Sequence, residues 1–225
     1  MLYLYAITHA PPALPTDRRG LSGAPLAAVI ERELAAVVSS VESGDIDPTE
    51  TTLWEHEAVC EALMETGTVL PARFGLLFSE EGALRDELRT RHIELRDALA
   101  RVAGRVEVGV RILRQDGSDS RASEPSGAER PGTAYLTARV AEHRRARELA
   151  ESVHEALAPL AAESRRQVVG GPALIMNAVY LLDRESASSF REKVERLAGE
   201  HTVAKFICTG PWPPYNFVTG SAESE

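Results

Sequence analysis

Apolar and polar residues alternate most regularly in the second half of the chain. Every second position from 106 to 112 is apolar, as in a half-buried strand: Val106, Val108, Val110 and Ile112. Similar reasoning predicts a helix at about 134–162, strands at about 165–169 and 174–182, a helix around Phe190 that ends at Gly199, and a strand at 203–208. The order β-α-β-β-α-β is that of the ferredoxin-like motif, in which helices cover one face of a four-stranded antiparallel sheet.

The first half has a less regular pattern. Residues 2–7 are apolar on both faces and predict a buried strand. Apolar residues at helical spacing predict a helix over 26–41: Leu26, Ile30, Leu34, Val37, Val38 and Val41. Thr52 and Glu55 have the spacing of a capping box that opens a helix to about Glu65, and Ser79 is expected to cap one long helix that ends at Gly104. We interpret this half as a modified ferredoxin-like domain.

These patterns predict an α+β protein of two domains and a tail. The N-terminal domain is expected at 1–104, the C-terminal domain at 105–209 and the tail at 210–225. Residues 115–133 are mostly Gly, Ser, Pro and charged residues, which predicts a flexible insertion in the second domain.

The tail carries three prolines and three aromatic residues within seven positions. Proline fixes φ and lacks an N–H donor, so the segment is expected to be extended and stiff rather than helical. Aromatic rings of this size bury about 150–250 Å² each, too much to leave together in water. We therefore expect the tail to dock, either on its own domain or on a partner, through Pro211, Trp212, Pro213, Pro214, Tyr215 and Phe217.

Charge argues against two classes of partner. The net charge of −9 disfavours binding to a nucleic acid backbone or an anionic membrane, both of which attract basic surfaces. Between Glu42 and Glu65 the chain has eight carboxylates and no Lys or Arg. This acidic stretch is either a solvated face or a docking surface for a basic or strongly hydrophobic partner.

Composition also bears on location. Two isolated cysteines, Cys60 and Cys208, suit reduced thiols in the cytoplasm. The N-terminus lacks the pattern of a signal peptide, and no apolar run is long enough to span a membrane. We expect a cytoplasmic protein.

No common catalytic signature occurs in the sequence. Phosphate-loop, dinucleotide, zinc-protease and hydrolase motifs are absent. The best metal-like group is Glu55, His56 and Glu57 with Glu61, which we interpret instead as part of a solvated acidic face. We expect no enzyme, cofactor or metal, and the alternative is a small-molecule enzyme or sensor with a cleft between two ferredoxin-like domains.

Three segments resemble one family. The tail 209–217 (TGPWPPYNF), the segment 69–78 (VLPARFGLLF) and the opening 3–7 (YLYAI) are together similar to the gas vesicle GvpF/GvpL proteins. The resemblance implies an accessory structural protein, located at the gas vesicle, that acts in vesicle assembly through the small hydrophobic shell protein GvpA, with other accessory proteins as further partners. It implies no catalysis and no cofactor.

Two groups of residues are candidates for contact. The aromatic residues of the tail either lie back on the chain's own sheet between the domains or contact the shell protein. Arg73 either pairs with the acidic stretch and fixes its domain or contacts a partner, and Phe74 belongs to the same segment.

Overall fold

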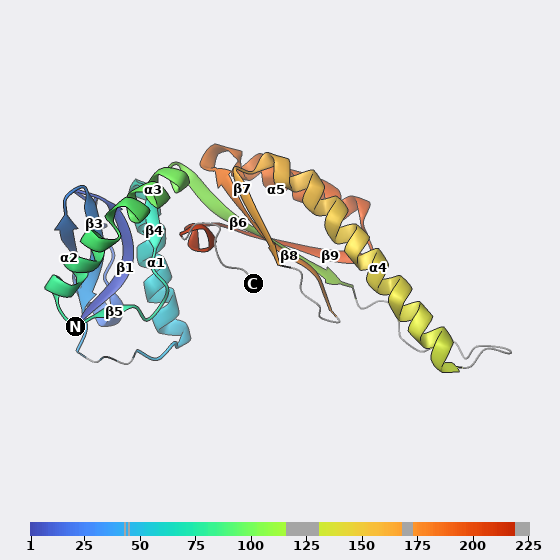
Figure 1. The fold of residues 1–225 in the computed structure, drawn as a ribbon, viewed down its shortest axis with the longest axis horizontal. Coiled ribbons are helices and arrows are strands. Elements are labelled where there is room, and N and C mark those ends of the chain that lie inside the picture. Colours follow the sequence, from blue (N-terminus) through green and yellow to red (C-terminus); the bar gives the residue numbers. More distant parts are fainter. Residues whose placement is uncertain (43, 45, 116–130, 168–172, 219–225) are drawn as a thin grey trace. The chain divides into compact units, whose positions relative to one another are not determined.

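The computed structural model describes residues 1–42, 44, 46–115, 131–167 and 173–218 (Figure 1). The chain divides into two compact units, one formed by Met1–Glu107 with Pro211–Glu225 and the other by Val108–Gly210. The predicted insertion lies outside the described residues over 116–130, and so do residues 168–172, where the predicted strand at 165–169 ends. Residues 131–133 of that insertion belong to helix α4.

The first unit contains an antiparallel sheet in the order β2-β3-β1-β4, with β5 also paired to β1. Its strands are β1 (Leu2–His9), β2 (Leu26–Glu31), β3 (Leu34–Ser40), β4 (Val69–Pro71) and β5 (Leu77–Phe78). Its helices are α1 (Glu50–Thr66), α2 (Glu81–Thr90) and α3 (His92–Val102), with a short 3-10 turn at Leu21–Gly23. The buried strand predicted at 2–7 is therefore present as β1.

The helix predicted over 26–41 is wrong, because this segment forms the hairpin β2–β3. The two strands pair from Leu26↔Ser39 to Glu31↔Leu34, which leaves Arg32 and Glu33 as the turn. Arg32 has a left-handed φ of 55°, which permits so tight a reversal. Strand β3 lies between β2 and β1 and is buried on both faces from Leu34 to Ser39.

Two helix starts also differ from the prediction. Helix α1 begins earlier than expected: Thr49 is its N-cap, and Thr52, the predicted cap, completes the capping box from inside the helix. The single helix expected from Ser79 is two helices, α2 and α3, which meet at Arg91. The cap residue of α2 is Glu80, without a side-chain capping bond.

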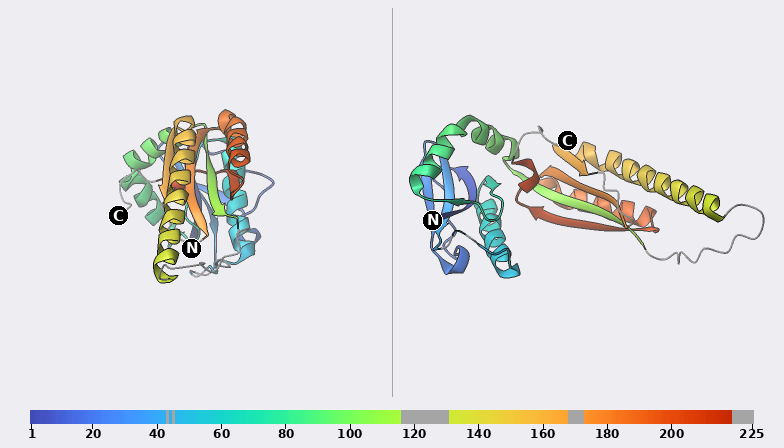
Figure 2. Two further views of the ribbon diagram at one scale, coloured as in Figure 1. Left: turned by 90° about the vertical axis from the view of Figure 1, so that its right-hand side faces the viewer. Right: turned by 60° about the horizontal axis from the view of Figure 1, so that its bottom comes forward.

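The second unit follows the predicted order of elements. After β6 (Arg105–Arg114) come α4 (Pro131–Leu157), a 3-10 turn at Ala158–Leu160, β7 (Glu163–Gln167), β8 (Leu174–Asp183), a 3-10 turn at Arg184–Ser186, α5 (Ala187–Glu200) and β9 (Ala204–Trp212). The sheet order is β7-β8-β6-β9. The long helix α4 is the yellow helix of Figure 2.

Both helices of this unit pack on the same face of the sheet. The core joins alternate residues of β6 and β8 to the inner faces of α4 and α5, including Val110, Val153, Tyr180 and Phe190. Together the two units confirm a mixed α+β protein with two antiparallel sheets.

The proline-rich segment is only partly extended. Strand β9 runs through Gly210 and Pro211 to Trp212, and it lies at the edge of the sheet, where a missing N–H donor breaks no interior ladder. Residues Tyr215–Phe217 then form a 3-10 turn. The prediction of a uniformly extended tail is therefore wrong beyond Pro214.

Candidate functional site

The C-terminal segment after β9 lies on the first unit, to which residues from Pro211 onward belong. Pro213, Pro214 and Phe217 are buried, and the Phe217 side chain is 0% exposed. Pro211 is exposed, and Trp212 and Tyr215 are half-buried. Two backbone hydrogen bonds, Tyr215 N–H to Pro213 O at 2.8 Å and Phe217 N–H to Pro214 O at 3.0 Å, close the turn that places these rings.

Side chains of the first unit hold this turn by hydrogen bonds. The Tyr215 hydroxyl donates to Glu57 Oε2 at 2.7 Å. Asn216 donates twice to Glu107, from its backbone N–H at 2.8 Å and from Nδ2 at 2.6 Å. Arg101 donates to the Phe217 carbonyl at 2.6 Å. The contacts thus combine an apolar anchor with charge-assisted hydrogen bonds, which are stronger than neutral ones.

Asn216 and Glu107 were not predicted as site residues. In the sequence, Glu107 is one of the polar residues that alternate with the valines of β6, so its expected place was the solvent. In the structure its side chain is only 6% exposed. No local pattern marks it, because its partner Asn216 is 109 residues away.

His56 lies beside the docked turn and is buried, at 3% exposure. Its Nδ1 is 2.8 Å from the Tyr3 hydroxyl and its Nε2 is 3.2 Å from the Ala72 carbonyl. A carbonyl only accepts, so Nε2 carries the hydrogen, and Nδ1 accepts from Tyr3. Burial lowers the pKa of His56 to about 4, against which its bond to Ala72 acts only weakly. His56 is therefore neutral at physiological pH, and its assignment to a solvated acidic face was wrong.

The groups around His56 are also held in their neutral forms. Burial raises the pKa of the Cys60 thiol to about 12, and the thiol donates to the Tyr5 carbonyl at 3.3 Å. Burial likewise raises the pKa of the Tyr3 and Tyr215 hydroxyls. A thiol that stays protonated is a poor nucleophile. This cluster is suited to packing and hydrogen bonding rather than to acid–base or nucleophilic chemistry.

Phe74 and Arg73 have different environments. The Phe74 ring lies edge-on to Tyr3 and His56, with centroid distances of 6.0 and 5.8 Å. Arg73 is exposed, and the ion pair expected between it and the acidic stretch is not formed with any residue that the structure describes. Across the described chain, no group of three or more His, Cys, Asp or Glu side chains is placed to hold a metal ion.

The acidic stretch carries exposed apolar residues that sequence reasoning missed. On α1, Leu53 is 44% exposed and Trp54 is 61% exposed. Glu50 lies one turn before Trp54 on the same helix and is also exposed. The only sequence signal was a tryptophan inside a predicted amphipathic helix, where the natural expectation is burial.

Comparison with known proteins decides the family. The family model for gas vesicle synthesis protein GvpL/GvpF matches residues 1–219. The chain belongs to the GvpL/GvpF family. Among its relatives, gas vesicle protein F2 of Halobacterium salinarum is 32% identical over 96% of this chain and 91% of its own length. Gas vesicle protein L of a Streptomyces species is 30% identical over 99% of this chain and 94% of its own length.

Solved structures of GvpF proteins share the fold. The crystal structure of GvpF from Anabaena covers 100% of this chain and 98% of its own, with a TM-score of 0.82 at 24% identity. GvpF from Microcystis aeruginosa covers 97% of this chain and 98% of its own, with a TM-score of 0.78 at 21% identity. Within the residues described here, no helix of this GvpL/GvpF chain is long and apolar enough to cross a membrane.

Proposed function

We propose that this GvpL/GvpF protein is an accessory structural protein that acts in gas vesicle assembly, at the vesicle, by binding the shell protein GvpA and without catalysing a reaction. The observation that carries the proposal is the family match over residues 1–219. The neutral, buried state of His56 and Cys60 supports a structural rather than a catalytic role.

The order of elements in the second unit supports a ferredoxin-like arrangement, with the sheet order β7-β8-β6-β9 and both helices on one face.

We further propose that the aromatic tail stabilises the first unit, to which it belongs, and does not contact a partner. Phe217, Pro213 and Pro214 are buried there, so they offer no surface to a partner.

The surface proposed for the shell protein is the outer face of α1. A shell subunit with a hydrophobic surface needs an apolar contact to shield that surface before assembly. Trp54 is 61% exposed, and tryptophan is enriched among the residues that dominate binding energy at interfaces. Arg73, which is also exposed in this unit, is a second proposed contact.

A pull-down with purified GvpA tests this surface. Replacing Leu53 and Trp54 together by serine should weaken GvpA binding at least about tenfold, since it removes the exposed apolar contact. The matched control is Ile93→Ser, because Ile93 is an apolar residue of α3 in the same unit at 66% exposure. Thermal unfolding should be unchanged in both variants. Undiminished binding by the double variant, or no binding by the intact chain, would reject the proposal.

A further inference from the structure

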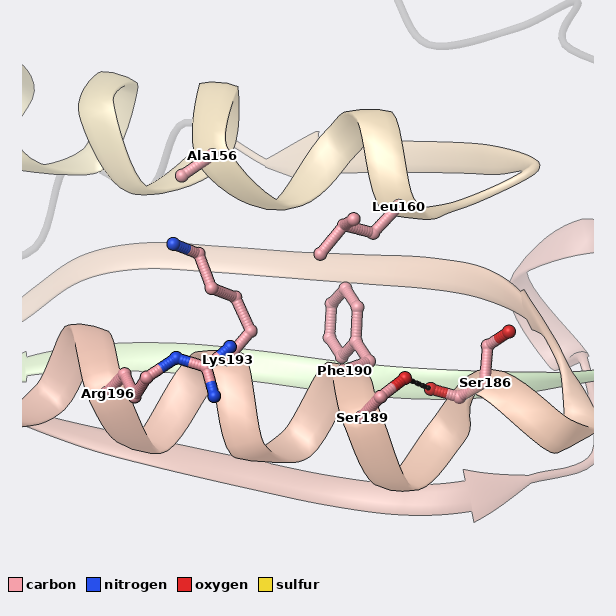
Figure 3. Close-up of a pocket in the computed structure, with 7 residues that line it drawn as sticks. All are labelled: Ala156, Leu160, Ser186, Ser189, Phe190, Lys193 and Arg196. Carbon is pink, nitrogen blue, oxygen red and sulfur yellow. Dashed lines mark hydrogen bonds between the residues drawn. The ribbon is translucent and has the colours of Figure 1, made fainter.

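A hollow of about 320 Å³ lies between the C-terminal end of α4 and helix α5 in the second unit (Figure 3). Its size is at the lower end of small ligand pockets, which range from about 300 to 1,000 Å³. All of its walls come from Val108–Gly210.

One wall of the hollow carries two positive charges. Lys193 and Arg196 are three residues apart on α5 and so lie on the same side of the helix. Figure 3 shows the Lys193 amine extending toward Ala156 of α4, with the Arg196 side chain beside it. Neither forms an ion pair with any described residue, although Glu192 and Glu200 each lie one turn from Arg196 on α5. Two neighbouring cations without a carboxylate repel each other, and an anion bound between them would offset this electrostatic repulsion.

The opposite side of the hollow is apolar. Leu160, in the turn that follows α4, is 50% exposed at the edge of the hollow, and the Phe190 ring, which is only 1% exposed, extends from α5 toward it. An occupant therefore meets cations on one side and hydrocarbon on the other.

The remaining polar groups do not form a cradle of donors. The Ser189 hydroxyl donates to the Ser186 carbonyl at 3.0 Å, so its hydrogen is already used, and the Ser186 hydroxyl at the start of α5 is one further donor on the same wall. Lys193 and Arg196 lie beyond the first turn of α5, where backbone N–H groups bond within the helix. Donors thus approach from one wall only, which suits a carboxylate on an amphipathic segment better than a phosphate surrounded by donors.

We infer that this hollow binds an acidic segment of a partner protein. A carboxylate of that segment lies between Lys193 and Arg196, and an adjacent apolar side chain packs on the exposed part of Leu160. The inference rests on the second unit alone and is independent of the α1 surface proposed for GvpA.

Nuclear magnetic resonance on the full chain labelled with ¹⁵N tests the site, with the blocked dipeptide acetyl-Asp-Leu-amide as the probe. The expected result is saturable shift changes confined to amides of about 156–160 and 186–196, weakened by added salt. The acetyl-Asn-Leu-amide dipeptide should bind at least about tenfold more weakly, because it lacks the charge.

A charge-matched pair of variants separates the site from general electrostatics. Lys193→Gln with Arg196→Gln should weaken acetyl-Asp-Leu-amide at least about tenfold. Arg145→Gln with Lys205→Gln removes the same charge from exposed positions outside the hollow and should leave the affinity unchanged. Amide spectra of both pairs report whether the fold is intact.

Three outcomes with the variants and dipeptides would overturn the inference. They are equal weakening in the two pairs, equal binding of the Asn and Asp dipeptides, and shift changes located away from α4 and α5. Tighter binding of inorganic phosphate than of the acidic dipeptide would also overturn it, since the hollow would then be a small-anion site.

Discussion

The residue that most clearly shows how this protein uses its polar groups is His56. It stacks on Tyr5, accepts from Tyr3 and donates to a backbone carbonyl, so both ring nitrogens are satisfied in the neutral form. A second hydrogen on the ring would have to share a site that already accepts from Tyr3. Acid should therefore destabilise the first unit, because the folded state cannot accommodate the protonated His56 ring.

The pH dependence of stability tests that argument. The pKa of His56 is about 4 in the folded state and 6.5 for an unperturbed histidine, so in acid the unfolded chain binds a proton that the folded chain excludes. The contribution of neutral His56 to the free energy of unfolding is complete above pH 6.5 and is lost as the pH falls toward 4. Between about pH 7.5 and about pH 5 the free energy of unfolding should fall by about 2 kcal/mol. Urea unfolding at both pH values measures the free energy of unfolding.

His56→Gln keeps a donor and an acceptor in place but cannot titrate, so it should remove most of the fall in the free energy of unfolding between about pH 7.5 and about pH 5. The control is His143→Gln at an exposed position of α4, which should retain it. If His56→Gln loses as much stability in acid as the intact chain, the buried neutral histidine is not the cause.

At the scale of elements, the segment 26–41 shows where sequence patterns mislead. Six consecutive residues of β3 are buried because the strand is covered on both faces. Such a run satisfies helical spacing and strand alternation equally well. The turn is also not recognisable from the sequence, because Arg32 occupies the left-handed conformation that Gly or Asn usually adopts. In contrast, the alternation in β6 has one buried and one polar side over most of its length, and its strand was predicted.

The docked C-terminal turn shows which features of a site can be predicted from sequence and which cannot. Stiff prolines and clustered aromatics led to the expectation that this segment docks, and in the structure Pro213, Pro214 and Phe217 are buried whereas Pro211 is exposed. The partners of the segment were not predicted, because Tyr215 and Glu57 lie 158 residues apart and nothing local links them. The sequence therefore predicted that the segment docks but not which side chains of the first unit hold it.

Charge reversal in this turn gives a test at the element scale. Asn216→Asp puts a second carboxylate where Nδ2 now donates to Glu107 Oε1 at 2.6 Å, while the backbone N–H keeps its bond to Oε2, and it should destabilise the protein by several kcal/mol. Asn216→Ala loses one hydrogen bond and should cost only about 1–3 kcal/mol. Chemical denaturation at neutral pH compares the two. Equal losses would show that the Asn216–Glu107 contact is not formed in solution.

For the whole molecule, the stability of the first unit depends on the C-terminal end of the chain. The chain leaves the first unit after Glu107 and returns to it at Pro211, so the last residues in sequence complete the first unit. A chain that ends at Trp212 keeps all of β9 but loses Phe217 and the groups that bond to Glu57 and Glu107.

Hydrogen exchange with mass spectrometry measures which unit responds to that truncation. Amides of β1, α1 and α3 should exchange at least about tenfold faster, while those of β8 and α5 keep their protection. Phe217→Ala should give the same pattern more weakly, since burying this ring is worth about 3–5 kcal/mol. Val203→Ala, at an exposed position, is the control. Faster exchange in the second unit alone would contradict the division.

Vesicle counts test whether this GvpL/GvpF protein acts in gas vesicle assembly through an apolar surface. Electron microscopy would compare cells that carry a complete set of gas vesicle genes with cells from which the gene for this chain has been removed. We expect few or no mature vesicles after removal, full recovery with the intact chain, and poor recovery with the Leu53→Ser, Trp54→Ser variant. Normal vesicle numbers without the chain would contradict this role.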